Sequence, residues 1–218
     1  MADPKPQGYY SQQRAELVDR LPRPFGRVLD VGCGEGAVGR LLLERGADAV
    51  VGVEVHEPAA VAARDAYDEV HAVPVEQALP LLEGPFDTIL LYDVVEHLVD
   101  PETVLRGLLG LARPGAVLHL SAPNARHWTL VRDLVLRGTF GYAESGHRDA
   151  THLRWFTRRD LVALLESAGW QVDGTSHGEL RPASALAARI TRGLTTEFLV
   201  YQWSVLARAP RSGTAAGR

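Results

Sequence analysis

Two carboxylates and one imidazole occur close together after an apolar segment of the chain. Residues 88–92 read T-I-L-L-Y, Asp93 follows them, and Glu96 and His97 come next. If the chain turns helical after Asp93, the i, i+3 and i+4 spacing places all three side chains on one face. Such a face can accept a proton, because histidine titrates near neutral pH. The candidate catalytic residues are His97 first, then His152 and His147 from a later loop, together with Asp93.

A glycine-rich turn follows an apolar stretch earlier in the chain. Residues 28–37 read V-L-D-V-G-C-G-E-G-A, with Asp30 just before three closely spaced glycines. Glycine adopts backbone dihedrals that other residues avoid, and it lets a ligand lie against the main chain below the positive end of a helix. Cys33 occupies a position that needs a small side chain, and nothing nearby indicates a thiolate nucleophile. The pattern is typical of a loop that binds a nucleotide cofactor.

Two cofactors fit this loop by spacing alone. Gly32, Gly34 and Ala37 match the dinucleotide fingerprint G-x-G-x-x-G/A, which binds NAD. Charge favours S-adenosylmethionine instead, because Asp30 and Glu35 would repel a pyrophosphate and attract a sulfonium and an ammonium. One such charge pair, roughly 6 Å apart at an effective dielectric of about 20, contributes about 3 kcal/mol. Glu54, at the end of the next apolar segment, can accept ribose hydroxyls and therefore supports either adenosine cofactor.

Alternating strand and helix patterns must position these residues. Such alternation predicts a mostly parallel sheet that is covered on both faces. Two helix starts are clear: Asp100 precedes a proline, and Thr157 forms a capping box with Asp160. The predicted strands cover residues 26–31, 49–55, 69–74, 87–92, 115–121, 170–176 and 198–207.

Composition limits the classes of function. A chain of 218 residues with 46% hydrophobic residues can bury one sizeable core, and its net charge of −4 gives no footprint for nucleic acid or an anionic membrane. No apolar run reaches the length of about 20 residues that spans a bilayer. A single cysteine and the absence of a leader before Tyr9 favour a cytoplasmic location. We expect a small-molecule substrate, with a homodimer left open.

One connection is longer than a sheet requires. Residues 124–155 hold a short amphipathic segment and a glycine-containing polar loop, and long connections at the carboxyl ends of strands commonly bind ligands. We predict that they cover the substrate. Seven arginines stand against four acids between residues 124 and 160, which favours an anionic or polar substrate, although a solvated helix face is the commoner explanation. The predicted divisions are an N-terminal helical segment at 1–24, the main domain at 25–207 and a disordered tail at 208–218.

Several motifs in this order resemble those of the class I S-adenosylmethionine-dependent methyltransferases. The resemblance runs from about Tyr9 to about Ala207 and is greatest to the branch that holds the ubiquinone-pathway O-methyltransferases and MetW-like proteins. The motifs are D-V-G-C-G-E-G, Glu54, P-F-D-T-I-L-L-Y-D-V-V-E-H-L (85–98), L-A-R-P-G-A-V-L-H-L-S-A-P-N (111–124) and F-T-R-R-D-L-V-A-L-L-E-S-A-G-W (156–170).

The resemblance implies a fold and an activity. The fold is a three-layer, Rossmann-like α/β structure whose seven-stranded sheet is mostly parallel, with the last strand antiparallel and the cover inserted after the fifth strand. The activity is methyl transfer to a hydroxyl of a phenol, a sugar or a natural-product intermediate. Two alternatives stay open, an NAD(P)-dependent oxidoreductase and a non-catalytic cofactor-binding partner protein. Related enzymes close an N-terminal segment over the cofactor, here through Tyr9, Tyr10 and Arg14. The alternative is a surface helix that packs through Leu17 and Leu21.

The resemblance also implies ligand sets. An acidic residue after the third strand contacts adenine in the family, and here Glu76 stands one position past Val75. The D-x-x-E-H spacing is similar to the E-x-x-E-H motif of small-RNA 2′-O-methyltransferases, which binds a divalent ion such as Mg²⁺ or Mn²⁺ with a later histidine. The alternative is a metal-free pocket lined by Glu96 and His97. The implied cofactor residues are Asp30, Gly32, Cys33, Gly34, Glu35, Gly36, Glu54, Val55, Glu76 and Asp93, and the implied metal ligands are Asp93, Glu96, His97 and His152.

Overall fold

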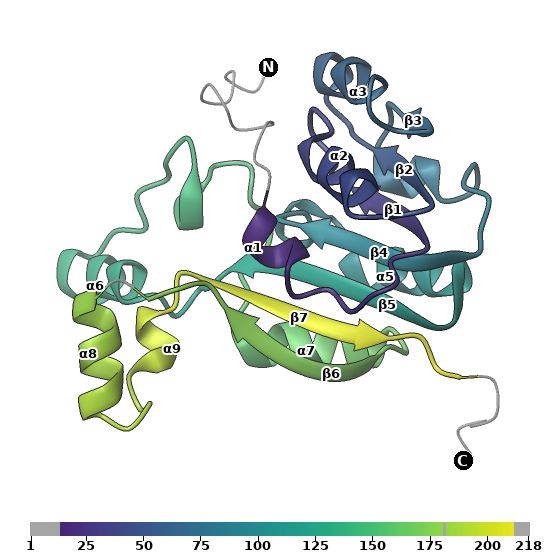
Figure 1. The fold of residues 1–218 in the computed structure, drawn as a ribbon. Coiled ribbons are helices and arrows are strands. Elements are labelled where there is room, and N and C mark those ends of the chain that lie inside the picture. The colour runs from purple at the N-terminus through teal and green to yellow at the C-terminus, as the bar shows by residue number, and fades with distance from the viewer. Residues whose placement is uncertain (1–13, 181, 212–218) are drawn as a thin grey trace.

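Seven strands form one sheet in the order β3-β2-β1-β4-β5-β7-β6 in the computed structural model, which describes residues 14–180 and 182–211 (Figure 1). The first five strands run parallel, and β7 is antiparallel to both β5 and β6. This confirms the predicted fold class and the antiparallel last strand. The strands are β1 (Arg27–Val31), β2 (Ala49–Val53), β3 (Glu69–His71), β4 (Phe86–Tyr92), β5 (Ala112–Pro123), β6 (Gln171–His177) and β7 (Gln202–Arg208).

Helices cover both faces of the sheet, because side chains on successive strand positions point to opposite sides. Val28 and Leu90 face one apolar cluster, whereas Leu29 and Ile89 face the other. The first cluster is completed by α1 (Ala15–Val18), α2 (Ala37–Glu44) and α3 (Glu57–Ala63). The second is completed by α4 (Val75–Ala78), α5 (Pro101–Gly110) and α7 (Arg158–Ser167).

Both predicted helix starts are present. The Asp100 carboxylate accepts a hydrogen bond from the Thr103 N–H at 3.1 Å and caps α5. Thr157 and Asp160 form the reciprocal capping box of α7. Leu161 and Leu165 on α7 are fully buried, so this face of the helix belongs to the core.

The long connection after β5 forms part of a lobe beside the end of the sheet (Figure 1). Asn124 anchors it, since its N–H donates to the Tyr201 carbonyl at 2.9 Å and its side chain donates to the Val200 carbonyl at 2.8 Å. The lobe contains α6 (Trp128–Arg137), a 3₁₀ turn (Gly146–Arg148), α8 (Pro182–Ile190) and α9 (Thr196–Leu199). Five of the seven arginines at residues 124–160 form ion pairs with the carboxylates of Asp133 or Glu197, so most of this positive charge is neutralised locally.

The two ends of the chain differ from their predicted boundaries. Tyr9 and Tyr10 lie outside the described residues, and α1 is only four residues long. β7 continues through Arg208, and Ala209 is buried and donates its N–H to the Ala116 carbonyl at 2.9 Å, so order extends into the predicted tail; residues 212–218 lie outside the described part. Within the described residues, no helix is long and apolar enough to cross a membrane.

Candidate active site

The glycine-rich loop joins β1 to α2 and has the backbone that its sequence predicts. Gly32, Gly34 and Gly36 have φ values of 74°, 54° and 82°, a region that residues with a side chain rarely adopt. Gly36 is the residue that precedes the first turn of α2. A Cβ on Gly32 would stand 2.5 Å from a methyl of Val94, so the loop lies directly against the turn that follows β4.

Asp30 is buried below this loop and is held by a tyrosine. The Tyr67 hydroxyl donates to the Asp30 carboxylate at 2.6 Å and accepts a hydrogen bond from the Gly39 N–H at 3.0 Å. Burial raises the pKa of Asp30 to about 7, against the lowering effect of the Tyr67 hydrogen bond. The sequence did not indicate this hydrogen bond, because Tyr67 lies in the connection between β2 and β3, 37 positions after Asp30. Asp30 can therefore change its charge near neutral pH.

Glu54 ends β2 with a carboxylate that is already oriented. One oxygen accepts the Gly34 N–H at 2.9 Å, and the other accepts the His56 N–H at 2.7 Å. Both hydrogen bonds fix the side chain at the loop while lone pairs remain on each oxygen. Burial, followed by the charges of Asp30 and Glu54, raises the pKa of the Cys33 thiol, which agrees with a structural role for that residue.

The other predicted cofactor residues lie at the surface. Glu35 is exposed within the loop, and Glu76 is exposed in the first turn of α4. Val55 is 67% exposed, so its side chain packs against no core cluster. These positions surround the loop and β2, but none of the three side chains makes a described polar contact that would assign it to adenine or ribose.

The turn after β4 is not the α-helix that the spacing suggested. Asp93 has a φ of 57°, and residues Val95–His97 form a single 3₁₀ turn. The left-handed Asp93 changes the direction of the chain, so its side chain does not share a helical face with Glu96 and His97. Its carboxylate instead forms an ion pair with Arg14 and accepts a hydrogen bond from the Gln202 side chain. Burial raises the pKa of Asp93, and the Arg14 charge opposes that effect.

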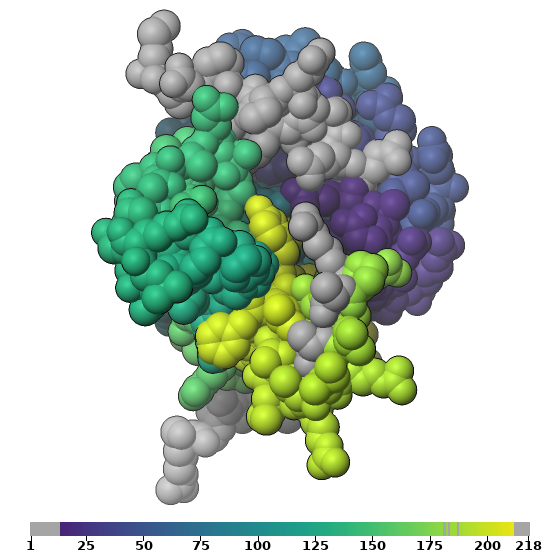
Figure 2. Space-filling view, turned by 90° about the vertical axis from the view of Figure 1, so that its left-hand side faces the viewer, coloured from purple at the N-terminus to yellow at the C-terminus, as the bar shows by residue number. Residues whose placement is uncertain are grey.

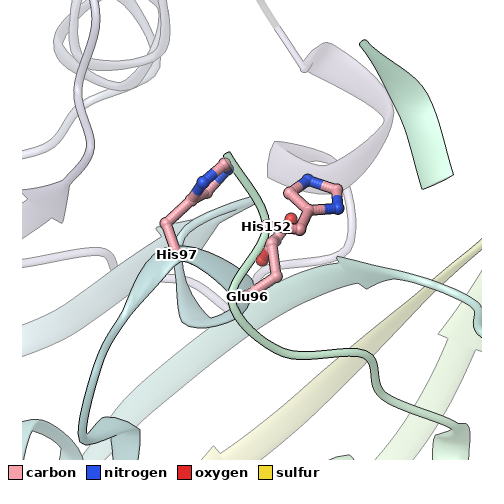
Figure 3. A group of neighbouring side chains, drawn as sticks. All are labelled: Glu96, His97 and His152. Carbon is pink, nitrogen blue, oxygen red and sulfur yellow. The ribbon is translucent and has the colours of Figure 1, made fainter. Parts of the chain in front are cut away.

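Glu96, His97 and His152 form a compact group (Figure 3). One ligand atom from each side chain lies within 4.8 Å of the other two, and the two imidazole rings meet edge to face with centroids 4.8 Å apart. The loop is held to the turn by its main chain, since the N–H groups of Leu153 and Arg154 donate to the Glu96 carbonyl at 2.9 and 3.1 Å. Asp93, the fourth predicted ligand, is not a member of this group, and its part in a metal site stays a prediction.

Glu96 is the unusual member of the group. Its side chain is 2% exposed, and neither carboxylate oxygen makes a hydrogen bond to any residue of the described chain. Burial raises its pKa well above the ordinary value, and the nearby Asp93 charge adds to that effect. A buried carboxylate with no partner is unfavourable by itself. The site therefore favours a proton or a cation at this position.

The third candidate histidine belongs to a different cluster. His147 is buried, hydrogen-bonds through Nε2 to the Tyr201 carbonyl at 2.7 Å and stacks on His127 with ring centroids 4.7 Å apart. Burial lowers its pKa. Tyr201 precedes Gln202, the partner of Asp93, so this aromatic cluster borders the carboxyl edge of the sheet. Figure 2 shows the insertion, the start of β7 and α1 meeting on one face of the molecule.

The sequence and structure of the chain resemble known methyltransferases. A family model described as a methyltransferase domain matches residues 6–174. A ubiquinone biosynthesis O-methyltransferase from Bordetella avium (strain 197N) is 35% identical over 175 residues, which are 73% of this chain and 68% of that protein. A tRNA 5-carboxymethoxyuridine methyltransferase from Escherichia coli (strain K12) is 34% identical over 174 residues, or 72% of this chain and 66% of that protein.

A solved structure agrees with the fold. A SAM-dependent methyltransferase from Archaeoglobus fulgidus superposes with a TM-score of 0.67 at 20% identity, covering 89% of this chain and 91% of that one. At this identity the likeness shows the fold alone. The present chain spans about two thirds of the length of the two curated relatives.

Proposed function

Because the chain belongs to the methyltransferase domain family of class I S-adenosylmethionine-dependent methyltransferases, we propose that it transfers the methyl group to a hydroxyl oxygen of a small molecule. The contact between Gly32 and Val94 is the observation that carries this proposal. It sets the cofactor loop against the turn that bears Glu96 and His97. A methyl group held by the loop would thus face side chains that can act on a hydroxyl.

Charge at the loop supports the sulfonium cofactor over a dinucleotide. Asp30 and Glu54 lie beneath and beside the loop, and Asp93 stands at the end of the neighbouring strand. The carboxyl groups of Asp30 and Glu54 attract the sulfonium and ammonium groups and repel a pyrophosphate, whereas Asp93 is already paired with Arg14. Glu54 is oriented by two backbone N–H groups and can still accept the ribose hydroxyls.

The chemical step is an in-line displacement. The acceptor oxygen forms a bond to the methyl carbon while the carbon–sulfur bond breaks, and the electron pair of that bond stays on sulfur in S-adenosylhomocysteine. The hydroxyl proton passes to a base. His97 suits this role, because its Nδ1 lies 3.2 Å from the Thr151 carbonyl and must donate there, which leaves the lone pair on Nε2. The protein otherwise aligns the two reactants and excludes water.

The Glu96, His97 and His152 group also fits a divalent ion, and we include one in the proposal. The carboxylate without a partner and the two imidazoles within 4.8 Å are a mixed oxygen and nitrogen donor set. Such a set suits Mn²⁺ better than Mg²⁺, which prefers oxygen ligands. When bound, the ion would polarise the acceptor oxygen and lower the pKa of its hydroxyl. His97 would then help to hold the ion together with Glu96 and His152.

The test combines methyl transfer with chelation. The full chain is incubated with labelled S-adenosylmethionine and fractionated small-molecule extract, with and without EDTA followed by Mn²⁺, and products are identified by mass. We expect a methyl ether and a loss of turnover on chelation that Mn²⁺ restores. Turnover that is unchanged by EDTA, in protein without bound metal, overturns the ion. An N-methyl or C-methyl product overturns the oxygen acceptor.

Variants separate the acceptor side from the cofactor side. Glu96→Gln should lower turnover by about a hundredfold or more while S-adenosylhomocysteine binds with unchanged affinity. Glu166→Gln, at an exposed position of α7, is the matched control and should behave as the native chain. Binding of NAD without S-adenosylmethionine would favour an oxidoreductase instead. Cofactor binding with methyl transfer only after a second protein is added would favour the non-catalytic role. The homodimer stays a prediction, which sedimentation velocity tests.

A further inference from the structure

A cavity of about 400 Å³ lies on the other half of the sheet, away from the glycine-rich loop. Its lining residues come from the chain that follows α1 and from the strands β5, β7 and β6. Arg20 bridges the two sides, because its guanidinium donates to the His177 carbonyl at 2.7 Å. The lining residues are Arg20, His119, Asp173, Gly174, Thr175, Ser176 and Leu206.

The two faces of the sheet differ at these strands. On one face, Leu118 and Leu120 of β5 are fully buried in the apolar cluster that α5 and α7 complete. On the other face, the polar residues His119 and Ser121 are buried, although strands covered on both sides are ordinarily apolar. Leu206 pairs with His119 in the register and stands beside the cavity. His119 is thus a buried polar side chain on the face of the sheet that borders the cavity.

His119 lines the cavity, and only one of its two ring nitrogens has a hydrogen-bond partner among the described residues. The side chain is 1% exposed, and its Nδ1 lies 3.0 Å from the Tyr92 hydroxyl. Its Nε2 makes no hydrogen bond to any residue that the structure describes. Burial, followed by the Arg20 charge, lowers the pKa of His119 to about 4, so the ring is neutral. With Tyr92 as the donor to Nδ1, the neutral ring carries its proton on Nε2, which can then donate to a ligand in the cavity that His119 lines.

Arg20 supplies a positive charge at the same cavity. Asp173, the acidic residue of the lining, is already paired with Arg208 at 2.7 Å. Arg20 has no ion pair among the described residues, and its one side-chain hydrogen bond goes to a neutral carbonyl. The cavity thus combines a guanidinium with an imidazole N–H donor. This combination matches a carboxylate, whose two oxygens accept hydrogen bonds from both.

We propose that this cavity binds a small molecule bearing a carboxylate, which contacts Arg20 and the Nε2–H of His119, at a site separate from the methyl-transfer site. The volume suits a ligand of one ring, within the range of small-molecule pockets. The inference does not depend on the nature of the methyl acceptor, because none of the lining residues belongs to the Glu96, His97 and His152 group.

The test is a titration of the full chain, labelled with ¹⁵N-histidine, with benzoate. We expect a saturable change in the imidazole resonances of His119 and none in those of His97. Benzamide, the uncharged isostere, should bind at least about tenfold more weakly, because it lacks the charge that Arg20 recognises. Arg20→Gln should weaken the binding of benzoate by a similar factor. Arg64→Gln replaces an exposed arginine at the end of α3 and should leave benzoate affinity unchanged.

Three outcomes overturn the proposal. These are no saturable change at His119, equal affinity for benzoate and benzamide, and equal affinity in the Arg20→Gln and native chains. The benzamide comparison needs no variant, so it decides the matter even if Arg20→Gln folds poorly. A change at His97 instead of His119 would place benzoate at the methyl-transfer site and would also overturn it. Methyl transfer measured on the same sample reports separately on the proposed function.

Discussion

The glycine-rich loop and the Glu96, His97 and His152 group lie side by side but are built in different ways. The loop is a continuous segment, and the two carboxyl groups beside it have hydrogen-bond partners: Tyr67 donates to Asp30, and two backbone N–H groups donate to Glu54. The second group needs a loop whose Thr151 follows His97 by 54 positions, and its Glu96 carboxylate has no described partner. The carboxyl groups beside the loop therefore have hydrogen-bond partners within the protein. The Glu96 carboxylate has none among the described residues and is stabilised only by a proton or a cation.

The two regions therefore depend on different parts of the chain, the first on backbone conformation and the second on a side-chain charge. The loop depends on glycine conformation, so a change there should damage both folding and cofactor binding. The second group depends on a charge that the fold disfavours, so its removal should improve folding while it damages catalysis. Four experiments, from the largest expected effect to the smallest, can break or sharpen this contrast.

Gly32→Ala should produce the largest effect. The new Cβ meets Val94 at 2.5 Å, and alanine is strained at a φ of 74°. We expect S-adenosylhomocysteine to bind at least about a hundredfold more weakly, together with about 1–2 kcal/mol of lost stability from backbone strain. Calorimetry and thermal unfolding measure the two effects. Gly46→Ala is the control, because its φ is also positive but no atom lies within 4 Å. Equal binding by the two variants would contradict the prediction.

Glu96→Gln should stabilise the chain increasingly as pH rises. Because the pKa of Glu96 is raised on folding, the folded state holds a proton that the unfolded state has lost above its ordinary pKa near 4.5. Stability from this group is present at low pH and is lost as pH rises toward the folded pKa. Thermal unfolding between pH 5 and 8 should show a growing advantage of the variant, on the order of a few degrees.

Asp100→Asn is the opposite control for that experiment. The Thr103 side chain and N–H lower the pKa of Asp100, so its carboxylate form favours the folded state above the ordinary pKa. Its replacement should destabilise the chain at neutral pH and lose this effect in acid. If Glu96→Gln showed the same pH trend as Asp100→Asn, the account of Glu96 would be wrong.

Cofactor binding should depend on pH through Asp30. Its pKa is raised to about 7 in the free chain, and a bound cation favours the carboxylate form, so binding releases a proton below that pH. Affinity for S-adenosylmethionine should rise with pH by up to about tenfold per unit below pH 7 and level off above it. Asp30→Asn should remove the slope. A native chain whose affinity does not change between pH 5.5 and 8 would contradict the role of Asp30.

Cys33→Ser should have the smallest effect. The pKa of the Cys33 thiol is raised by burial and by neighbouring carboxyl groups, so little thiolate forms at neutral pH. We expect cofactor affinity within about twofold of the native value and no inactivation of the native chain by a thiol reagent. The rate of thiol modification in native and unfolded protein measures this directly. Rapid loss of binding on modification of folded protein would assign Cys33 a larger role.

The sequence alone determined the features that depend on neighbouring residues. Apolar runs predicted all seven strands within a few residues, Asp100 and Thr157 predicted two helix starts, and the glycines of the loop predicted its positive φ angles. Each of these follows from local sterics, hydrogen bonding or periodicity, which act over a few residues. The resemblance then supplied the antiparallel β7.

Tertiary structure decided which distant side chains meet. Asp93 adopts a left-handed conformation and pairs with Arg14 and Gln202, which come from opposite ends of the chain. The expected helical spacing with Glu96 and His97 was therefore wrong for Asp93, while His152 joined them from the insertion. The charge of a carboxyl group also depends on the whole fold. Only the packed protein removes water from the carboxyl group, and this loss of water raises its pKa. For this reason the sequence could name the reactive residues but could not choose between them.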